Sequence, residues 1–109
     1  MKYQVSHEQK IICGMIPKYR DLCILILGEY VNHNLLFSGT VTYGVNLRRL
    51  GQYPFIVSDE SPFQEPILGL SSCIWFLPQF QCTLERIQTN DNSFRLPILI
   101  DILPNRVGR

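Results

Sequence analysis

Hydrophobic and polar residues alternate in the C-terminal third of the chain, and this alternation predicts a β-sheet. The apolar residues of one parity are Phe94, Leu96, Ile98, Ile100 and Ile102. A period of two places successive side chains on opposite faces of a strand. We therefore expect a long strand over 93–102 with this parity facing the core and with Leu99 as the apolar exception on the polar face.

A second strand is predicted just before it, because Phe80, Cys82 and Leu84 alternate with polar residues. The polar loop 89–92 (TNDN) has the composition of a hairpin turn. A plain four-residue loop would pair the wrong faces, so we expect a bulge near Glu85–Arg86 or a loop of odd length. Pro97 has no N–H to donate, which indicates an edge or a break in the pairing.

The rest of the chain adds further elements. We expect a third strand over 73–77, a strand buried on both faces at 22–27, and a hairpin over 22–45 with its turn at 32–34. A helical turn is predicted at 46–51, a strand at 52–58 and a loop at 59–66. Ser6 and Gln9 have the spacing of a capping box, which predicts a short helix over 7–16, although a β element fits the same run.

Together these elements predict one domain over 1–109, mainly β or α+β. The predicted architecture is an antiparallel sheet or a small barrel of about six strands with one or two short helices.

Composition changes this picture mainly through charge. Charged residues make up 17 % of the chain and the net charge is +1, and such a sparsely charged surface favours association with a partner or a second copy. The same balance argues against strong nonspecific binding of nucleic acid, but it leaves room for a local basic patch. No apolar run reaches the ~20 residues of a membrane-spanning helix, and no leader segment is visible, so we expect a cytoplasmic protein without a membrane partner.

Candidate chemistry is sparse. The four cysteines show neither a CxxC nor a zinc-ligand pattern and are expected to be reduced core thiols. The chain has neither a phosphate-binding glycine loop nor a hydrolase or metalloprotease motif. We therefore expect no enzyme activity, no catalytic residue, no metal and no cofactor.

The favoured interpretation is a non-enzymatic protein-interaction module, self-associating or docking on a larger assembly. Its expected partner-binding residues are aromatic anchors of the kind found at interface hot spots. They are Phe63, Trp75, Phe76 and Phe80.

The alternative is a small β-barrel that binds nucleic acid with surface aromatics and basic residues. The candidate residues for this function are Tyr43, Arg48, Arg49 and Tyr53. Lys18, Arg20, Arg106 and Arg109 can add positive charge to the surface in this interpretation.

Overall fold

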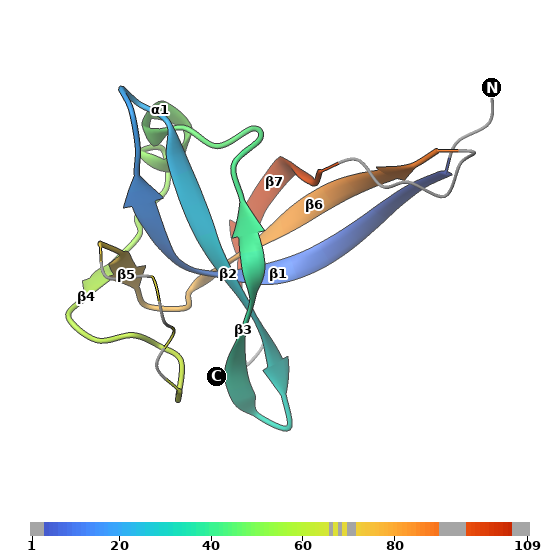
Figure 1. The fold of residues 1–109 in the computed structure, drawn as a ribbon. Coiled ribbons are helices and arrows are strands. Elements are labelled where there is room, and N and C mark those ends of the chain that lie inside the picture. Colours follow the sequence, from blue (N-terminus) through green and yellow to red (C-terminus); the bar gives the residue numbers. More distant parts are fainter. Residues whose placement is uncertain (1–3, 66, 68, 70–71, 90–95, 106–109) are drawn as a thin grey trace.

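A computed structural model of the chain describes residues 4–65, 67, 69, 72–89 and 96–105. Over these residues the chain forms a seven-stranded antiparallel sheet and one turn of helix (Figure 1). This confirms the predicted mainly β, antiparallel architecture. The strands are β1 (Gln4–Pro17), β2 (Cys23–Val31), β3 (Asn34–Val41), β4 (Val57–Ser58), β5 (Ile74–Phe76), β6 (Phe80–Gln88) and β7 (Ile98–Pro104), and the helix is α1 (Leu47–Leu50).

The 14-residue strand β1 organises the sheet. Its C-terminal half pairs with β2 from Ile11 to Pro17, and its N-terminal half pairs with β6 from Gln4 to Ile11. The short strand β5 also pairs with β1, at Gly14 and Met15. Beyond the body of the molecule, β1 and β6 continue as a projecting two-stranded arm (Figure 1).

The short helix predicted over 7–16 is wrong, because these residues belong to β1. Ile11 and Ile12 are both buried, yet they lie in two different hydrophobic clusters on opposite faces of the strand. Gln9 does not cap a helix. Its side chain donates instead to the hydroxyl of Thr83 on β6, at 2.9 Å. The pairing with β6 comes from 74 residues away and overrides the local capping pattern.

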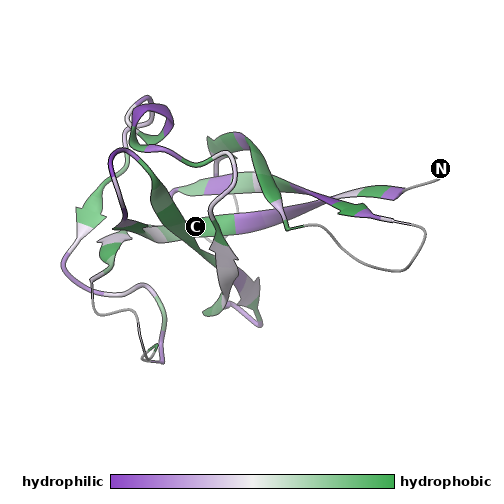
Figure 2. Ribbon diagram, turned by 45° about the horizontal axis from the view of Figure 1, so that its top comes forward, coloured by the Kyte–Doolittle hydropathy of each residue, from purple (hydrophilic) through white to green (hydrophobic). Residues whose placement is uncertain are grey.

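Two hydrophobic clusters lie on the two faces of the β1–β2 pair. The inner core consists of Ile12, Cys23, Leu25, Leu27, Val41, Val45, Leu50, Phe76, Phe80, Cys82, Leu84, Leu99 and Ile102. The outer core consists of Ile11, Cys13, Ile26, Leu35 and Phe63. Strand β2 contributes to both clusters, which confirms the prediction that it is buried on both faces. Figure 2 shows the hydrophobic stretches in the body of the molecule and hydrophilic stretches along the arm.

A bulge in β7 reverses the face that the sequence predicts. Thr83 pairs with Asp101 and Leu84 pairs with Leu99, so Ile100 is an extra residue between them. Leu99 is consequently 2 % exposed, whereas Ile98 and Ile100 are 40 % and 41 % exposed. The expected bulge exists, but it lies nearer the middle of β6 and its extra residue is on β7. Phe94 lies outside the described residues.

The hairpin of β2 and β3 and the helical turn α1 confirm two further predictions. Asn32 and His33 both have positive φ, at 52° and 68°, and Val31 pairs with Asn34 across them. This two-residue loop has the backbone that matches the twist of its strands. The strand predicted over 52–58 is shorter than expected, because only Val57 and Ser58 pair with β5.

The sheet is not closed into a barrel by a continuous ladder. Instead, the end of β3 meets the start of β7, where Leu99 N donates to the carbonyl of Tyr43 at 2.9 Å. Gly44 follows with φ +81°, and a Cβ there would lie 2.6 Å from the carbonyl oxygen of Leu99. Only glycine fits this close crossing, which fixes the position of Tyr43 against β7.

Candidate functional site

The turn between β1 and β2 exposes the side chains of Lys18, Tyr19, Arg20, Asp21 and Leu22. Lys18 N donates to the carbonyl of Leu22 at 2.8 Å, which closes the turn. Arg20 has a positive φ of 61°, a conformation that costs a residue with a Cβ roughly 1–2 kcal/mol. Its guanidinium carbon lies 5.1 Å from the ring centroid of Tyr19, within cation–π range.

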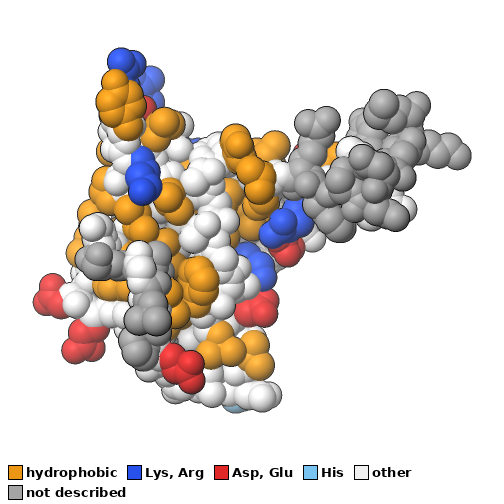
Figure 3. All heavy atoms as spheres, viewed as in Figure 1, with side chains coloured by type: hydrophobic (Ala, Val, Ile, Leu, Met, Phe, Trp, Pro, Cys, Tyr) orange, Lys and Arg blue, Asp and Glu red, His pale blue; other side chains and the backbone are white. Residues whose placement is uncertain are grey.

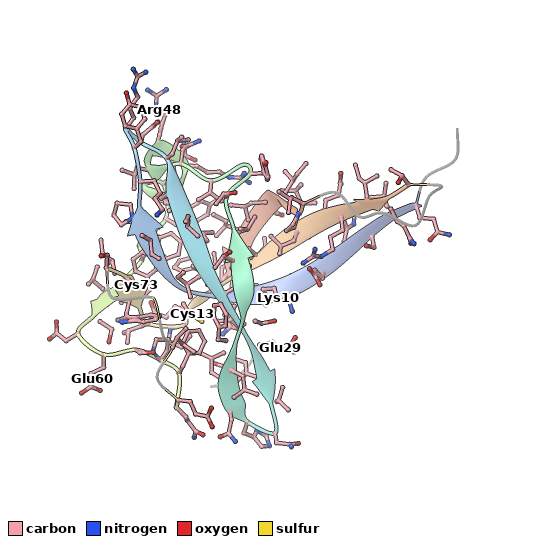
Figure 4. The ribbon with its side chains drawn as sticks, viewed as in Figure 1. Lys10, Cys13, Glu29, Arg48, Glu60 and Cys73 are labelled. Carbon is pink, nitrogen blue, oxygen red and sulfur yellow. The ribbon has the colours of Figure 1, made fainter. Side chains whose placement is uncertain are left out.

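The helix α1 docks against this turn. Leu47 N donates to the carbonyl of Asp21 at 2.7 Å, and Leu22 forms a bridge with Asn46. The Asn46 side chain caps the helix by accepting from Arg49 N at 2.8 Å. This docking places the exposed Arg48 beside the turn (Figure 4). We call the group formed by Lys18, Tyr19, Arg20 and Arg48 the basic tip.

A groove of about 340 Å³ adjoins the basic tip. Its lining residues are Lys18, Leu22, Cys23, Ile24, Thr42 and Tyr43. Leu22 and Tyr43 are 54 % and 53 % exposed, so large parts of both side chains face solvent. Burial raises the pKa of the Cys23 thiol, which therefore stays uncharged at neutral pH. The groove thus combines apolar and aromatic walls with the ammonium group of Lys18 and the hydroxyl groups of Thr42 and Tyr43.

Positive side chains form two groups on the face drawn in Figure 3. One lies at the end that carries the basic tip, and the other lies towards the arm, next to Asp and Glu side chains. Asp59, Glu60 and Glu65 are exposed on the loop after β4, and Figure 4 shows Glu60 far from Arg48. Asp21 lies in the same turn, and its negative charge offsets part of the positive charge of the basic tip. The chain therefore has a local basic surface, although its net charge is only +1.

Of the four residues predicted to bind nucleic acid, two lie at the candidate site and two do not. Arg48 lies in the basic tip and Tyr43 lines the groove. Arg49 is instead engaged within the chain, where Nη1 donates to the carbonyls of Gly44 and Leu99, each at 3.0 Å. Tyr53 packs against the inner core, with its ring centroid 6.0 Å from that of Phe80.

The four residues predicted to bind a partner lie in the two hydrophobic cores. Phe76 and Phe80 are buried in the inner core, where each ring contacts Phe55. Phe63 and Trp75 lie in the outer core, with their ring centroids 5.7 Å apart. Partner binding by these residues stays a prediction. The contacts that the structure shows for them are intramolecular.

The thiols are poorly suited to nucleophilic chemistry. Burial raises the pKa of Cys13 and of Cys82 to about 12, and the neighbouring thiols Cys82 and Cys73 add to the shift at Cys13. All four cysteines are free. Over the part of the chain that the structure describes, His, Cys, Asp and Glu form no group of three that fits a metal ion. Over those residues, too, every helix is too short or too polar to cross a membrane.

Tyr19 and Leu22 were not predicted as site residues, and Lys18 and Arg20 were given only a supporting role. Arg106 and Arg109, given the same role, lie outside the described residues. A helix over 7–16 does not indicate a hairpin turn at 18–21. If 7–16 is read as a strand, the KYRD sequence at 18–21 becomes a hairpin turn between two strands. That assignment would have indicated an exposed cluster of two cations and an aromatic ring.

Comparison with known proteins gives matches in solved structures alone. No family model matches the sequence, and no curated protein matches it. The ligase domain of LigD from M. tuberculosis matches 90 % of this chain with a TM-score of 0.70 and 19 % identity. A mycobacterial DNA ligase D complexed with ATP and MES matches 93 % with a TM-score of 0.67 and 19 % identity. The chain spans about a third (35 %) of each matched ligase chain.

This likeness contradicts two predictions from the sequence. The chain was expected to be a non-enzymatic protein-interaction module, and enzyme activity was expected to be absent. The fold instead matches part of an enzyme domain. The absence of enzyme activity was predicted from missing catalytic motifs, and the interaction module from sparse charge and aromatic anchors. Neither pattern reports the fold of the chain.

Proposed function

We propose that this chain is the DNA-binding β domain of a ligase-type enzyme, and that it holds DNA through the basic tip. The observation that carries the proposal is the placement of Lys18, Arg20 and Arg48 together beside an aromatic groove. Phosphate groups are bound by clustered Lys and Arg, while base faces stack on aromatic rings. The matched proteins are DNA ligases, which supports DNA as the polyanion.

Strand connectivity supports the same function. Strands β1, β2 and β3 form a meander, α1 follows, and β6 returns to pair with β1 before β7 reaches the end of β3. This is the order of the OB fold, a partly open five-stranded barrel. OB folds bind oligonucleotides at the face of strands 2 and 3 and at the loop between strands 1 and 2. The basic tip and its groove lie at this loop.

The backbone conformation of Arg20 also supports a role for its side chain in DNA binding. Glycine or asparagine would occupy a position with φ 61° at lower cost. A strained residue that retains a charged side chain at an exposed turn suggests a function for that side chain. Its stacking on Tyr19 holds the guanidinium outward, where a phosphate group can reach it.

The reaction itself is proposed for the enzyme that this domain serves, with the catalytic groups supplied by a second domain. The free state of the four cysteines fits a reducing compartment, so a cytoplasmic location remains part of the proposal. The complete enzyme, purified from its own cells together with this chain and supplied with ATP, should seal a nicked duplex. If it does not, the enzymatic part of the proposal fails, while DNA binding is tested separately.

The test of DNA binding is fluorescence anisotropy with a labelled nicked duplex over a range of salt concentrations. Arg48→Gln should weaken binding and reduce the slope of log K against log salt by about 0.9, because one phosphate contact is lost. Arg86→Gln is the matched control. It removes the same charge from the arm, where Arg86 forms an ion pair with Glu8 at 2.6 Å.

The control variant should keep the salt slope of the parent protein. Equal losses in the two variants would show that net charge, not the basic tip, governs binding. An absence of binding by the parent protein at low salt would exclude the proposed function.

A further inference from the structure

We infer that the groove beside the basic tip receives a single unpaired nucleobase, so that the preferred DNA has an unpaired end rather than a blunt one. This inference rests on the proposed function and deepens it. The apolar and aromatic residues that line the groove include Leu22, Ile24 and Tyr43. Ile24 belongs to β2, Leu22 directly precedes β2, and Tyr43 follows β3.

The size and polarity of the groove fit a flat heterocycle. Its volume of about 340 Å³ lies at the lower end of the range of roughly 300–1,000 Å³ for small-molecule sites. Tyr43 is half exposed and offers a ring on which a base can stack. The hydroxyl of the exposed Thr42 can donate to or accept from the edge of a base.

Charge complementarity selects a base that is still attached to a strand. Lys18 belongs to both the groove and the basic tip, and Arg20 lies two residues away in the same turn. A base bound in the groove therefore brings its own phosphate next to these cations. A purely apolar ligand would make no ionic contact with Lys18 or Arg20.

The position of Tyr43 is fixed before any ligand binds. Its carbonyl accepts from Leu99 N at 2.9 Å, and the next residue, Gly44, crosses β7 in close contact with the Leu99 carbonyl. Arg49 donates to the carbonyls of Gly44 and Leu99 and so secures the crossing. Because the backbone is already held, only the side-chain rotation of Tyr43 is lost when a base stacks on its ring.

The experiment compares two labelled duplexes of equal length, one blunt and one with a short single-stranded overhang. Tyr43→Ala should lower the affinity for the overhang duplex by about 5- to 100-fold, because one stacking contact is lost. Its affinity for the blunt duplex should stay within about twofold of the parent protein's. Tyr43→Phe keeps the ring and should behave as the parent protein does.

Tyr19→Ala is the matched aromatic control, because Tyr19 is exposed in the tip but does not line the groove. It should affect the two duplexes equally. A 2-aminopurine placed in the overhang should change its fluorescence with the parent protein and with Tyr43→Phe, but not with Tyr43→Ala.

The inference is overturned if Tyr43→Ala affects both duplexes equally or neither. If neutralising Arg48 weakens binding in that case, the proposed function stands and the base site alone is rejected. If the parent protein binds neither duplex, both proposals are rejected.

Discussion

At the scale of single residues, burial determines the chemistry of the cysteines. Cys13 and Cys82 are completely buried, and burial raises the pKa of each to about 12 from a usual value of 9.0. In the unfolded chain these thiols lose their protons near pH 9, whereas in the folded chain they keep them. Above pH 9 the folded state therefore binds more protons than the unfolded state, and rising pH favours unfolding.

We predict that the free energy of unfolding falls as the pH rises from 9 towards 12. Each of the two thiols contributes at most about 1.4 kcal/mol per pH unit to this fall. Urea unfolding at several pH values should show the fall, and Cys82→Ala should make it less steep. Val41→Ala is the control, because it removes a buried side chain from the same inner core without removing a thiol. Equal pH slopes in the parent protein and in Cys82→Ala would contradict the prediction.

At the scale of elements, the bulge in β7 determines which apolar side chains stabilise the fold. The bulge turns Leu99 into the inner core and leaves Ile100 at the surface, although both are apolar and adjacent. The side chains of Leu99 and Ile100 are similar in size, but they therefore contribute differently to the stability of the fold.

We predict that Leu99→Ala lowers the free energy of unfolding by about 2–4 kcal/mol, because it opens a cavity in the inner core. Ile100→Ala should cost less than about 1 kcal/mol, because its side chain is 41 % exposed. Chemical denaturation of the two variants measures both values. A larger loss of stability in Ile100→Ala than in Leu99→Ala would mean that Ile100 faces the core, as the sequence pattern alone predicts, and would contradict the bulge.

At the scale of the whole molecule, the arm and the body differ in how they are held together. Past the pairing of Glu85 with Ile98, the arm is two-stranded over the described residues. Its cross-strand contacts are polar, such as His7 with Glu85 at 3.0 Å and Glu8 with Arg86 at 2.6 Å. Exposed ion pairs contribute little to stability, about 0–1 kcal/mol each, and an isolated two-stranded ribbon is marginally stable.

We predict that amide hydrogens at the end of the arm exchange by local opening. Residues 5–8 and 85–88 should exchange at least roughly tenfold faster than the paired amides of Ile12 and Leu25, which require larger unfolding. Hydrogen exchange followed by NMR measures this difference. Uniform protection along the whole of β1 would show that arm and body open as one unit.

The sequence predicts those parts of the molecule that depend on local pattern. The alternation over 80–84, the apolar run over 22–27 and the capped turn at 46–51 all appear as expected. Three features depend on residues distant in sequence and were predicted wrongly or only in part. Strand β1 depends on a partner some 74–78 residues away, the face of β7 depends on a bulge, and the basic tip depends on the docking of α1 against Asp21.

The division of β1 between two partners also determines the order in which the chain is able to fold. Pairing of β1 with β2 and of β2 with β3 closes short loops, so this meander can form early at small entropic cost. Pairing of β1 with β6 joins His7 to Glu85, a separation of 78 residues, and it must wait until the intervening chain has been organised. Until then, the N-terminal half of β1 presents unpaired backbone groups on the edge that β6 will occupy. In the nascent protein this half-strand is thus the segment most exposed to pairing with another chain.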